Sequence, residues 1–204
     1  MSTAITRLAR VSGLVASFLA LLVVLSACFE ASNAVSAPPV WKNQRTQLFS
    51  IDYMNNWNIS TKDLYLGASS PQLEMLQGTL FTSVEDPVAS LHVLYAARPN
   101  NTVSSRDLML KFFLGSSQHP LQASSLSTIT LNGERWYQGS IEKQVKQSDG
   151  STLAAKETVL GINHSISTNK TELYFIIYQD ATSSYAKTSH DYFERMVKSF
   201  RFSS

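Results

Sequence analysis

Hydrophobic and polar positions divide the chain into an apolar N-terminal stretch and a longer region of regular patterns. Residues 11–25 (VSGLVASFLALLVVL) are almost entirely apolar, and a short basic segment containing Arg7 and Arg10 precedes them. A basic segment, an apolar core and then small residues predict an export signal peptide over residues 1–27. The apolar core is too short for a membrane-spanning helix, which needs about 20 residues.

The next segment, residues 28–44, shows no hydrophobic period and consists mostly of small and polar residues. Pro38 and Pro39 stiffen it locally. This composition predicts a flexible tether over residues 28–44, followed by a globular domain over residues 45–204.

The first half of that domain mixes strand-like and helical patterns. Alternating or continuous apolar residues predict strands at 49–53, 57–60 and 89–97. Residues 102–114 predict a helix, because Ser104 lies at its N-cap position and Gly115 provides a stop.

Tight turns organise the second half. The pair Asn132-Gly133 favours a type I′ connection between two strands, and further turn signals occur at residues 149–150 and 168–170. The strands that these turns connect are predicted at 127–131, 134–145, 152–167 and 171–178. Four strands joined in this way predict an antiparallel meander.

Helical spacing returns near the C-terminus, over residues 183–200. The four side chains of Phe193, Met196, Val197 and Phe200 fall in one stripe, because steps of three, four and seven residues return to the same helix face. We expect this stripe to pack on the meander. The charged residues expected to face water are Lys187, Asp191, Glu194, Arg195 and Lys198.

These elements predict an α+β fold, in which an antiparallel β-sheet is flanked by helices. The segments FSIDYMNNWNIS (49–60) and YFERMVKSFRF (192–202) resemble the two ends of PsbP-like domains, although Met54 stands where that family usually has proline. The resemblance implies an α/β/α sandwich over residues 45–204. Photosystem II accessory subunits and bacterial lipoproteins of unassigned role share that fold.

The single cysteine of the chain, Cys28, cannot form an internal disulfide and follows the apolar stretch directly. Leu25-Ser26-Ala27-Cys28 resembles the bacterial lipobox. The resemblance implies that the Cys28 thiol is diacylglycerated and that the chain is cut just before it. The protein would then be lipid-anchored to the outer face of the cell membrane or to the outer membrane. A plain signal peptide or an uncleaved anchor is the alternative.

Charge argues against a nucleic-acid partner. The chain has 17 basic and 15 acidic residues and a formal net charge of +2. Arg7 and Arg10 supply that excess, so the part after residue 27 is neutral. A neutral domain without a basic stripe has no electrostatic footprint for nucleic acid.

No metal or cofactor site is predicted. The four histidines are His92, His119, His164 and His190. No two of them have the short spacing of a metal-binding motif such as H-x-x-x-H. We therefore expect scattered histidines, while a cluster formed only by the fold stays open.

Candidates for catalysis are equally sparse. The serines of Gly115-Ser116-Ser117 and Gly139-Ser140 lack the strained G-x-S-x-G turn of a hydrolase. Glu85-Asp86 precedes a proline and indicates a turn rather than an acid–base pair. The aromatic residues best suited to a ligand are Trp57, Trp136 and Tyr137, of which Trp57 is expected in the core. The N-x-S/T sequences at Asn58, Asn100, Asn163 and Asn169 are interpreted as chance matches.

The sequence therefore predicts a membrane-anchored extracytoplasmic lipoprotein that acts as a non-catalytic binding or assembly module with a protein partner in the envelope. The alternative is an envelope hydrolase with an unrecognised active site. Convergent polar groups in a pocket would favour the enzyme, and a flat apolar patch would favour the binding module.

Overall fold

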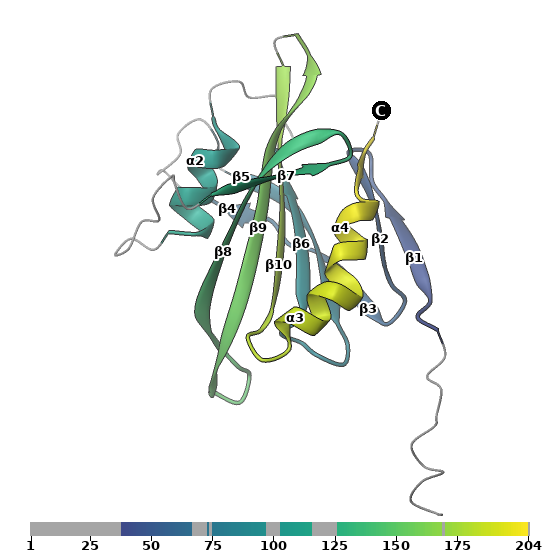
Figure 1. The fold of residues 1–204 in the computed structure, drawn as a ribbon, viewed down its shortest axis with the longest axis vertical. Coiled ribbons are helices and arrows are strands. Elements are labelled where there is room, and N and C mark those ends of the chain that lie inside the picture. Colours follow the sequence, from purple (N-terminus) through teal and green to yellow (C-terminus); the bar gives the residue numbers. More distant parts are fainter. Residues whose placement is uncertain are drawn as a thin grey trace, which may run out of the picture. The chain divides into compact units, whose positions relative to one another are not determined.

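The computed structural model of the 204-residue chain describes residues 38–66, 73, 75–96, 103–115, 126–168 and 170–203. The predicted signal peptide, Cys28 and the first part of the tether lie outside the described residues and stay predictions. Strands account for 57% of the described residues, and two short helical segments accompany them (Figure 1).

The main element is a large antiparallel sheet. Within the described residues, its strands follow the order β3-β5-β6-β10-β9-β8-β7, and β4 also pairs with β5. The strands are β3 (Trp57–Thr61), β4 (Leu64–Tyr65), β5 (Met75–Ser83), β6 (Ser90–Tyr95), β7 (Ser127–Leu131), β8 (Glu134–Lys146), β9 (Thr152–Ser167) and β10 (Lys170–Ala181). The predicted meander is thus confirmed as β7-β8-β9-β10.

The hairpin between β7 and β8 has the predicted turn. Asn132 has a φ of 54° and Gly133 a φ of 81°. A type I′ turn requires positive φ at both central residues, which asparagine and glycine tolerate best. The turn places Leu131 opposite Glu134 and so fixes the register of the whole hairpin.

A smaller sheet contains β1 (Trp41–Arg45), β2 (Phe49–Met54) and β11 (Arg201–Phe202) in the order β1-β2-β11. β1 pairs with β2 over its full length. Residues 41–44, which the sequence assigned to the tether, therefore belong to the folded unit that begins at Val40.

The helical segments occupy the predicted places. The first consists of α2 (Ser105–Leu108) and the π-helical η2 (Met109–Phe113). The second consists of α3 (Tyr185–Thr188), η4 (Ser189–Phe193) and α4 (Glu194–Ser199). The predicted N-cap is confirmed, because the Ser104 hydroxyl accepts a hydrogen bond from the Asp107 N–H.

The predicted fold class is wrong. The protein is mostly β, and it is not an α+β fold or a PsbP-like α/β/α sandwich whose sheet is flanked by helical layers. Two causes explain the difference. The expected tether supplies β1, and β10 continues to Ala181, beyond the predicted strand end at residue 178. Both additions increase the strand content, while the helical segments stay too short to form layers.

Two hydrophobic clusters lie on opposite faces of the large sheet, as the alternation along β10 requires. Tyr174 and Ile176 belong to the first cluster, which also contains the C-terminal helical segment and β2. Leu173 and Phe175 belong to the second cluster, which contains α2 and η2. The predicted helix stripe is confirmed as buried, at Phe193, Met196, Val197 and Phe200. The five charged residues expected in water are exposed.

Candidate functional site

The α2–η2 segment covers only one end of its sheet face. It packs closely there because Gly161 on β9 has no side chain; a Cβ at this position would lie 2.6 Å from the Met109 Sδ. Beside it, the rings of Phe113 and Phe175 lie 5.0 Å apart. Figure 1 shows α2 near one end of the strands, with β8 and β9 extending well beyond it.

Two cross-strand rows of residues follow beyond the covered end. Strand register places Leu80, His92, Ile177, Val159 and Gly139 in the first row. It places Thr82, Ser90, Gln179, Glu157 and Ile141 in the second row. The second row is mostly polar, although its strands lie in the middle of the sheet.

Leu80, His92 and Ile177 of the first row and all five residues of the second row line a concave site of about 650 Å³, which we call the open-face cavity. Phe112 and Phe113 of η2 line it at the covered end, and Lys143 of β8 lies next to the polar row. The volume is within the usual range for small-molecule sites, which is roughly 300–1,000 Å³. The cavity is therefore the main candidate for a ligand site.

An ion pair between Glu157 and Lys143 lies in this cavity. The Glu157 side chain is only 10% exposed, whereas that of Lys143 is 36% exposed. The Lys143 ammonium donates to the Glu157 Oε2, which compensates for the burial of the carboxylate. No described residue donates to the Glu157 Oε1, so this oxygen is available to a ligand.

His92 lies in the same cavity, and its Nε2 is 2.7 Å from the Lys62 carbonyl oxygen. Because a carbonyl can only accept, Nε2 carries the hydrogen and Nδ1 is an acceptor in the neutral ring. Burial lowers the pKa of His92 below its usual 6.5, and the hydrogen bond to Lys62 opposes this in part. Gly78 permits the contact, since a Cβ there would lie 2.1 Å from the Lys62 oxygen.

Gln179 adds an oriented amide to the polar row. Its Nε2 donates to the Val88 carbonyl at 3.4 Å, which leaves the amide oxygen as an acceptor. Together, Glu157, Gln179 and neutral His92 give the lining several acceptors, while Phe112 and Ile141 give it apolar area. This combination suits an amphiphilic ligand that carries hydrogen-bond donors on its polar part.

The other histidines are not brought to this site. His164 on β9 bonds the Glu134 carboxylate through Nδ1 at 2.7 Å, and Phe202 stacks on its ring at 3.7 Å between centroids. His190 is exposed on η4, and His119 lies outside the described residues. Across the described ranges, no three or more metal-ligating side chains of His, Cys, Asp or Glu gather into a possible metal site.

The candidate nucleophile Ser140 lies on the opposite sheet face. Its hydroxyl is 2.6 Å from the Thr158 Oγ1, which accepts a hydrogen bond from the Tyr185 hydroxyl at 2.5 Å. Burial raises the pKa of Tyr185, so this phenol stays protonated at neutral pH. Ser140 therefore belongs to a chain of hydroxyl groups that contains no base. Ser116 and Ser117 lie outside the described residues.

The Glu85-Asp86 pair forms a turn, as expected. The Asp86 Oδ1 accepts from the Val88 N–H at 3.0 Å, and Glu85 accepts from the Asn56 amide at 3.0 Å. Both carboxylates therefore stabilise the loop between β5 and β6.

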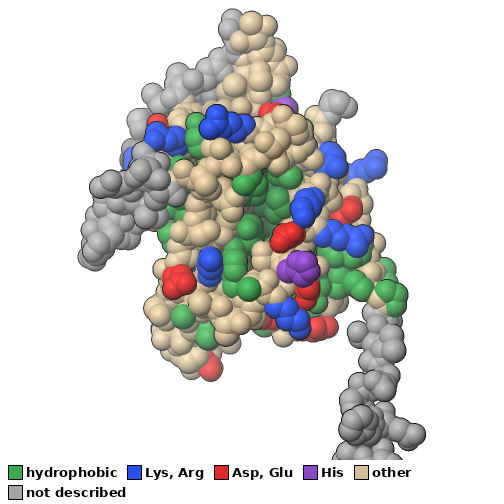
Figure 2. Space-filling view, in the orientation of Figure 1, with side chains coloured by type: hydrophobic (Ala, Val, Ile, Leu, Met, Phe, Trp, Pro, Cys, Tyr) green, Lys and Arg blue, Asp and Glu red, His purple; other side chains and the backbone are tan. Residues whose placement is uncertain are grey.

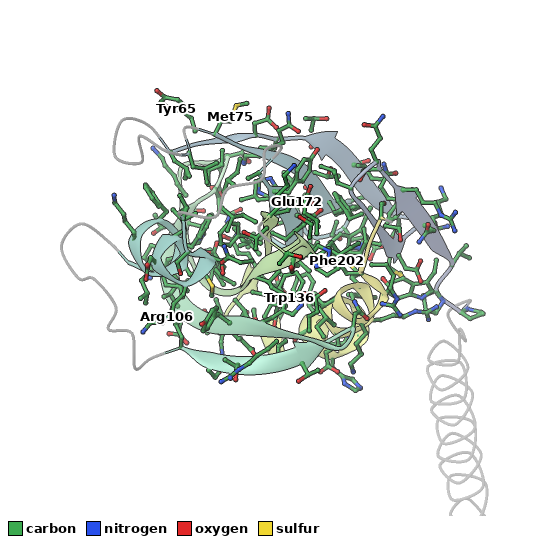
Figure 3. The ribbon with its side chains drawn as sticks, turned by 90° about the horizontal axis from the view of Figure 1, so that it is seen from above. Tyr65, Met75, Arg106, Trp136, Glu172 and Phe202 are labelled. Atoms are coloured by element: carbon green, nitrogen blue, oxygen red, sulfur yellow. The ribbon has the colours of Figure 1, made fainter. Side chains whose placement is uncertain are left out.

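The candidate aromatic residues are mainly structural. Trp57 and Trp136 are 5% and 0% exposed and belong to the first cluster, while Tyr137 packs against the second. Figure 3 shows Trp136 and Phe202 close together in the interior, and their rings stack at 5.9 Å. Tyr65 and Met75, a cross-strand pair, point outward instead.

Two of the N-x-S/T asparagines are described. Asn58 is exposed on β3. Asn163 accepts from the Ser105 N–H and donates to the Val103 carbonyl, so it anchors the start of α2 to β9. Asn100 and Asn169 lie outside the described residues.

Sequence reasoning missed most of the open-face cavity. Lys143, Glu157 and Gln179 come from three strands and look like ordinary polar positions of half-buried strands. Only the cross-strand register brings them together. Gly78 carried a signal, because a glycine inside a strand often marks a close approach of another group.

Comparisons with known proteins do not place the chain in a family. No protein-family model matches the sequence, and no curated protein matches it. Among solved structures, one similar chain is LpqN, described as involved in cell envelope biogenesis of Mycobacterium tuberculosis. The identity is 12% and the TM-score 0.39, and the match covers 83% of this chain and 88% of LpqN.

The described residues contain no helix with the length and apolar character needed to cross a membrane.

Proposed function

We propose that the protein is a lipoprotein anchored on the extracytoplasmic side of a membrane, and that its domain is a non-catalytic binding module. The anchor is supported by the lone Cys28 at the end of a signal-like segment. Two or more acyl chains at this position would hold the domain firmly at a membrane surface. Residues 28–39 would link the lipid to the folded unit.

One observation carries the binding role, namely the open-face cavity on the incompletely covered sheet face. Its floor consists of central strands, which hold their side chains rigidly in register. Hydrogen-bond acceptors of Glu157 and Gln179 lie beside the apolar surface of Phe112 and Ile141. We infer an amphiphilic small-molecule ligand. Its hydrogen-bond donors would bind the polar row, and its apolar part would cover Phe112.

An envelope hydrolase is the alternative, and His92 is the observation that favours it. A neutral histidine with a free Nδ1 in a cavity could act as a general base. Catalysis would also need a nucleophile within hydrogen-bond distance of the ring. Among the described residues, His92 bonds a backbone carbonyl and no hydroxyl, so the binding role is preferred.

Native mass spectrometry of the protein, extracted from its own membrane in mild detergent, tests the binding role. We expect a bound small molecule on the wild type. Ser90→Tyr, which fills the cavity from the polar row, should lose it. Ser183→Tyr, at an exposed turn, should retain it. Equal occupancy in both variants, or none in the wild type, would refute the binding role. A bound molecule that differs from its membrane precursor by the addition of water would favour the hydrolase.

The anchor is tested by the intact mass of the same preparation. The mature chain should begin at Cys28 and carry acyl chains, and Cys28→Ala should leave the precursor uncut at this position. An unmodified N-terminus elsewhere would contradict the anchor without affecting the binding role.

A further inference from the structure

β7 forms one edge of the large sheet in the described structure. The two-residue turn after Leu131 makes Leu131 and Glu134 a hydrogen-bonded pair, so every second residue of β7 bonds to β8. The backbone groups of Thr128 and Thr130, which lie between these positions, consequently point away from β8. No described residue donates to them or accepts from them. The edge therefore offers two N–H groups and two carbonyls.

An apolar groove of about 280 Å³ lies beside this edge. Its lining joins β7 to β9 and to the C-terminal helical segment through five apolar side chains. These are Ile129, Leu131, Leu160, Phe193 and Val197. Figure 2 shows hydrophobic side chains at the centre of this face, with charged side chains beside them.

The groove is smaller than a typical small-molecule site, but it can accept one or two side chains. Its rim is electrically balanced, because Lys198 donates to Glu194 at 3.0 Å. An unpaired strand edge next to a small, neutral, apolar groove is the arrangement that binds extended peptides by strand addition.

We propose that β7 docks an extended segment of a protein partner, which pairs with Thr128 and Thr130 and places alternate apolar side chains in the groove. Backbone bonds would provide affinity, and the groove would select apolar residues at every second position. The occupant is a neutral segment with strand-like alternation.

A second copy of this chain fits the edge poorly. The two apolar side chains of β7 are engaged in their own core, because Leu131 is 6% exposed and the partly buried Ile129 packs against the same cluster. A second β7 would thus present mainly serine and threonine side chains to an apolar groove.

This surface is independent of the proposed ligand site. The groove and the open-face cavity share no lining residue, so either can fail without the other. The β7 edge would bind a protein segment, whereas the open-face cavity would bind a small molecule.

Peptide display on the purified full-length protein in mild detergent tests the proposal. Two libraries of segments of about seven residues, a common strand length, share one composition. Apolar residues occupy alternate positions in one library and helical spacing in the other. We expect the wild type to enrich the alternating library.

Thr130→Pro removes an outward N–H that makes no bond within the sheet, and edge strands tolerate proline there. It should weaken the selected peptides by at least about tenfold, equivalent to about 1.4 kcal/mol. Thr130→Val keeps the N–H and should bind like the wild type. Ser189→Trp fills the groove without changing the backbone of the edge, and it should also weaken binding. This variant tests the proposal if Thr130→Pro does not fold.

Several outcomes would overturn the proposal. They are enrichment of the helically spaced library, no enrichment of either library, and equal binding by the wild type and both blocking variants. Light scattering, which measures the oligomeric state, tests whether a second copy of the chain occupies the edge. A wild-type dimer that Thr130→Pro converts to a monomer would show that a second copy occupies the edge.

Discussion

The two faces of the large sheet are built from the same strands but are covered very differently. The C-terminal helical segment and the small sheet cover the first face with a dense aromatic cluster. Phe200, for example, lies within 5.7 Å of the ring centres of both Phe49 and Trp136. The second face is covered at one end by α2–η2 and then becomes polar. The change from apolar to polar residues therefore follows the limit of the helical cover.

Two glycines lie at the end of the second face that the helical segment covers. A Cβ on Gly139 would lie 2.3 Å from Leu114 beside the helical cover, and a Cβ on Gly161 would collide with Met109. Close packing at that end thus depends on missing side chains. Beyond it, Glu157 and Gln179 occupy positions that a complete cover would require to be apolar. The first face is therefore almost fully packed and has only the small groove beside β7, whereas the second face keeps the open-face cavity beyond its helical cover.

The largest expected effect is on the first face. Phe193 is 1% exposed and contacts Trp57, Tyr178 and Tyr185. Phe193→Ala should reduce the free energy of unfolding by about 3–5 kcal/mol, because truncation removes buried contacts and leaves a cavity. Urea denaturation followed by circular dichroism measures this change.

The adjacent exposed residue is the matched control. Glu194→Ala should leave the free energy of unfolding nearly unchanged, since this side chain lies in water. If both substitutions destabilised the protein equally, the assignment of the buried stripe would be wrong.

The local elements of the fold could be predicted because their signals are local. Asn132-Gly133 specified a turn through its backbone preference, and the spacing of Phe193, Met196 and Val197 specified a buried helix face. Each signal spans a few residues and depends on steric rules that act within them.

The fold class and the site could not be predicted, because they depend on pairing between distant residues. Residues 41–44 look like part of a polar tether in the sequence and become a strand only against β2. Glu157 and Ser90 become neighbours in one row only through the register of β10. Neither pairing leaves a periodic signal in the chain.

The second prediction compares two ion pairs. Lys143→Met keeps the apolar stem but removes the donor to Glu157, whose side chain is 10% exposed. Leaving that buried carboxylate unpaired should cost about 1–3 kcal/mol in the free energy of unfolding. Lys198→Met breaks the pair with Glu194, in which both side chains are largely exposed, and should have little effect. Equal changes in denaturant midpoint would mean that the open face does not bury Glu157.

The third prediction concerns the attachment of the helical cover. The Ser104 hydroxyl caps α2, whereas Ser184 at the start of α3 makes no capping bond. Ser104→Ala should lower stability by about 0.5–1 kcal/mol, and Ser184→Ala by less. Hydrogen exchange at the Asp107 amide should increase in the first variant only. An unchanged exchange rate would show that the cover is held by packing alone.

The smallest effect is a pH dependence at the open face. Burial lowers the pKa of His92 below 6.5 in the folded protein, against an opposing contribution from its bond to Lys62. As the pH falls below about 6.5, the unfolded chain binds a proton that the folded protein still excludes, so the free energy of unfolding decreases. Above about pH 6.5 the imidazole is neutral in both states, and His92 adds no pH dependence there.

His92→Gln tests this directly, because glutamine can still donate to the Lys62 carbonyl but does not titrate. Between about pH 7.5 and about pH 5, the wild type should lose more stability than the variant, as measured by urea unfolding. His190→Gln, at an exposed position on η4, is the control and should follow the wild type. Parallel pH curves for the wild type and His92→Gln would mean that water reaches the imidazole freely. The part of the open-face cavity around His92 would then be too well solvated to favour the neutral imidazole.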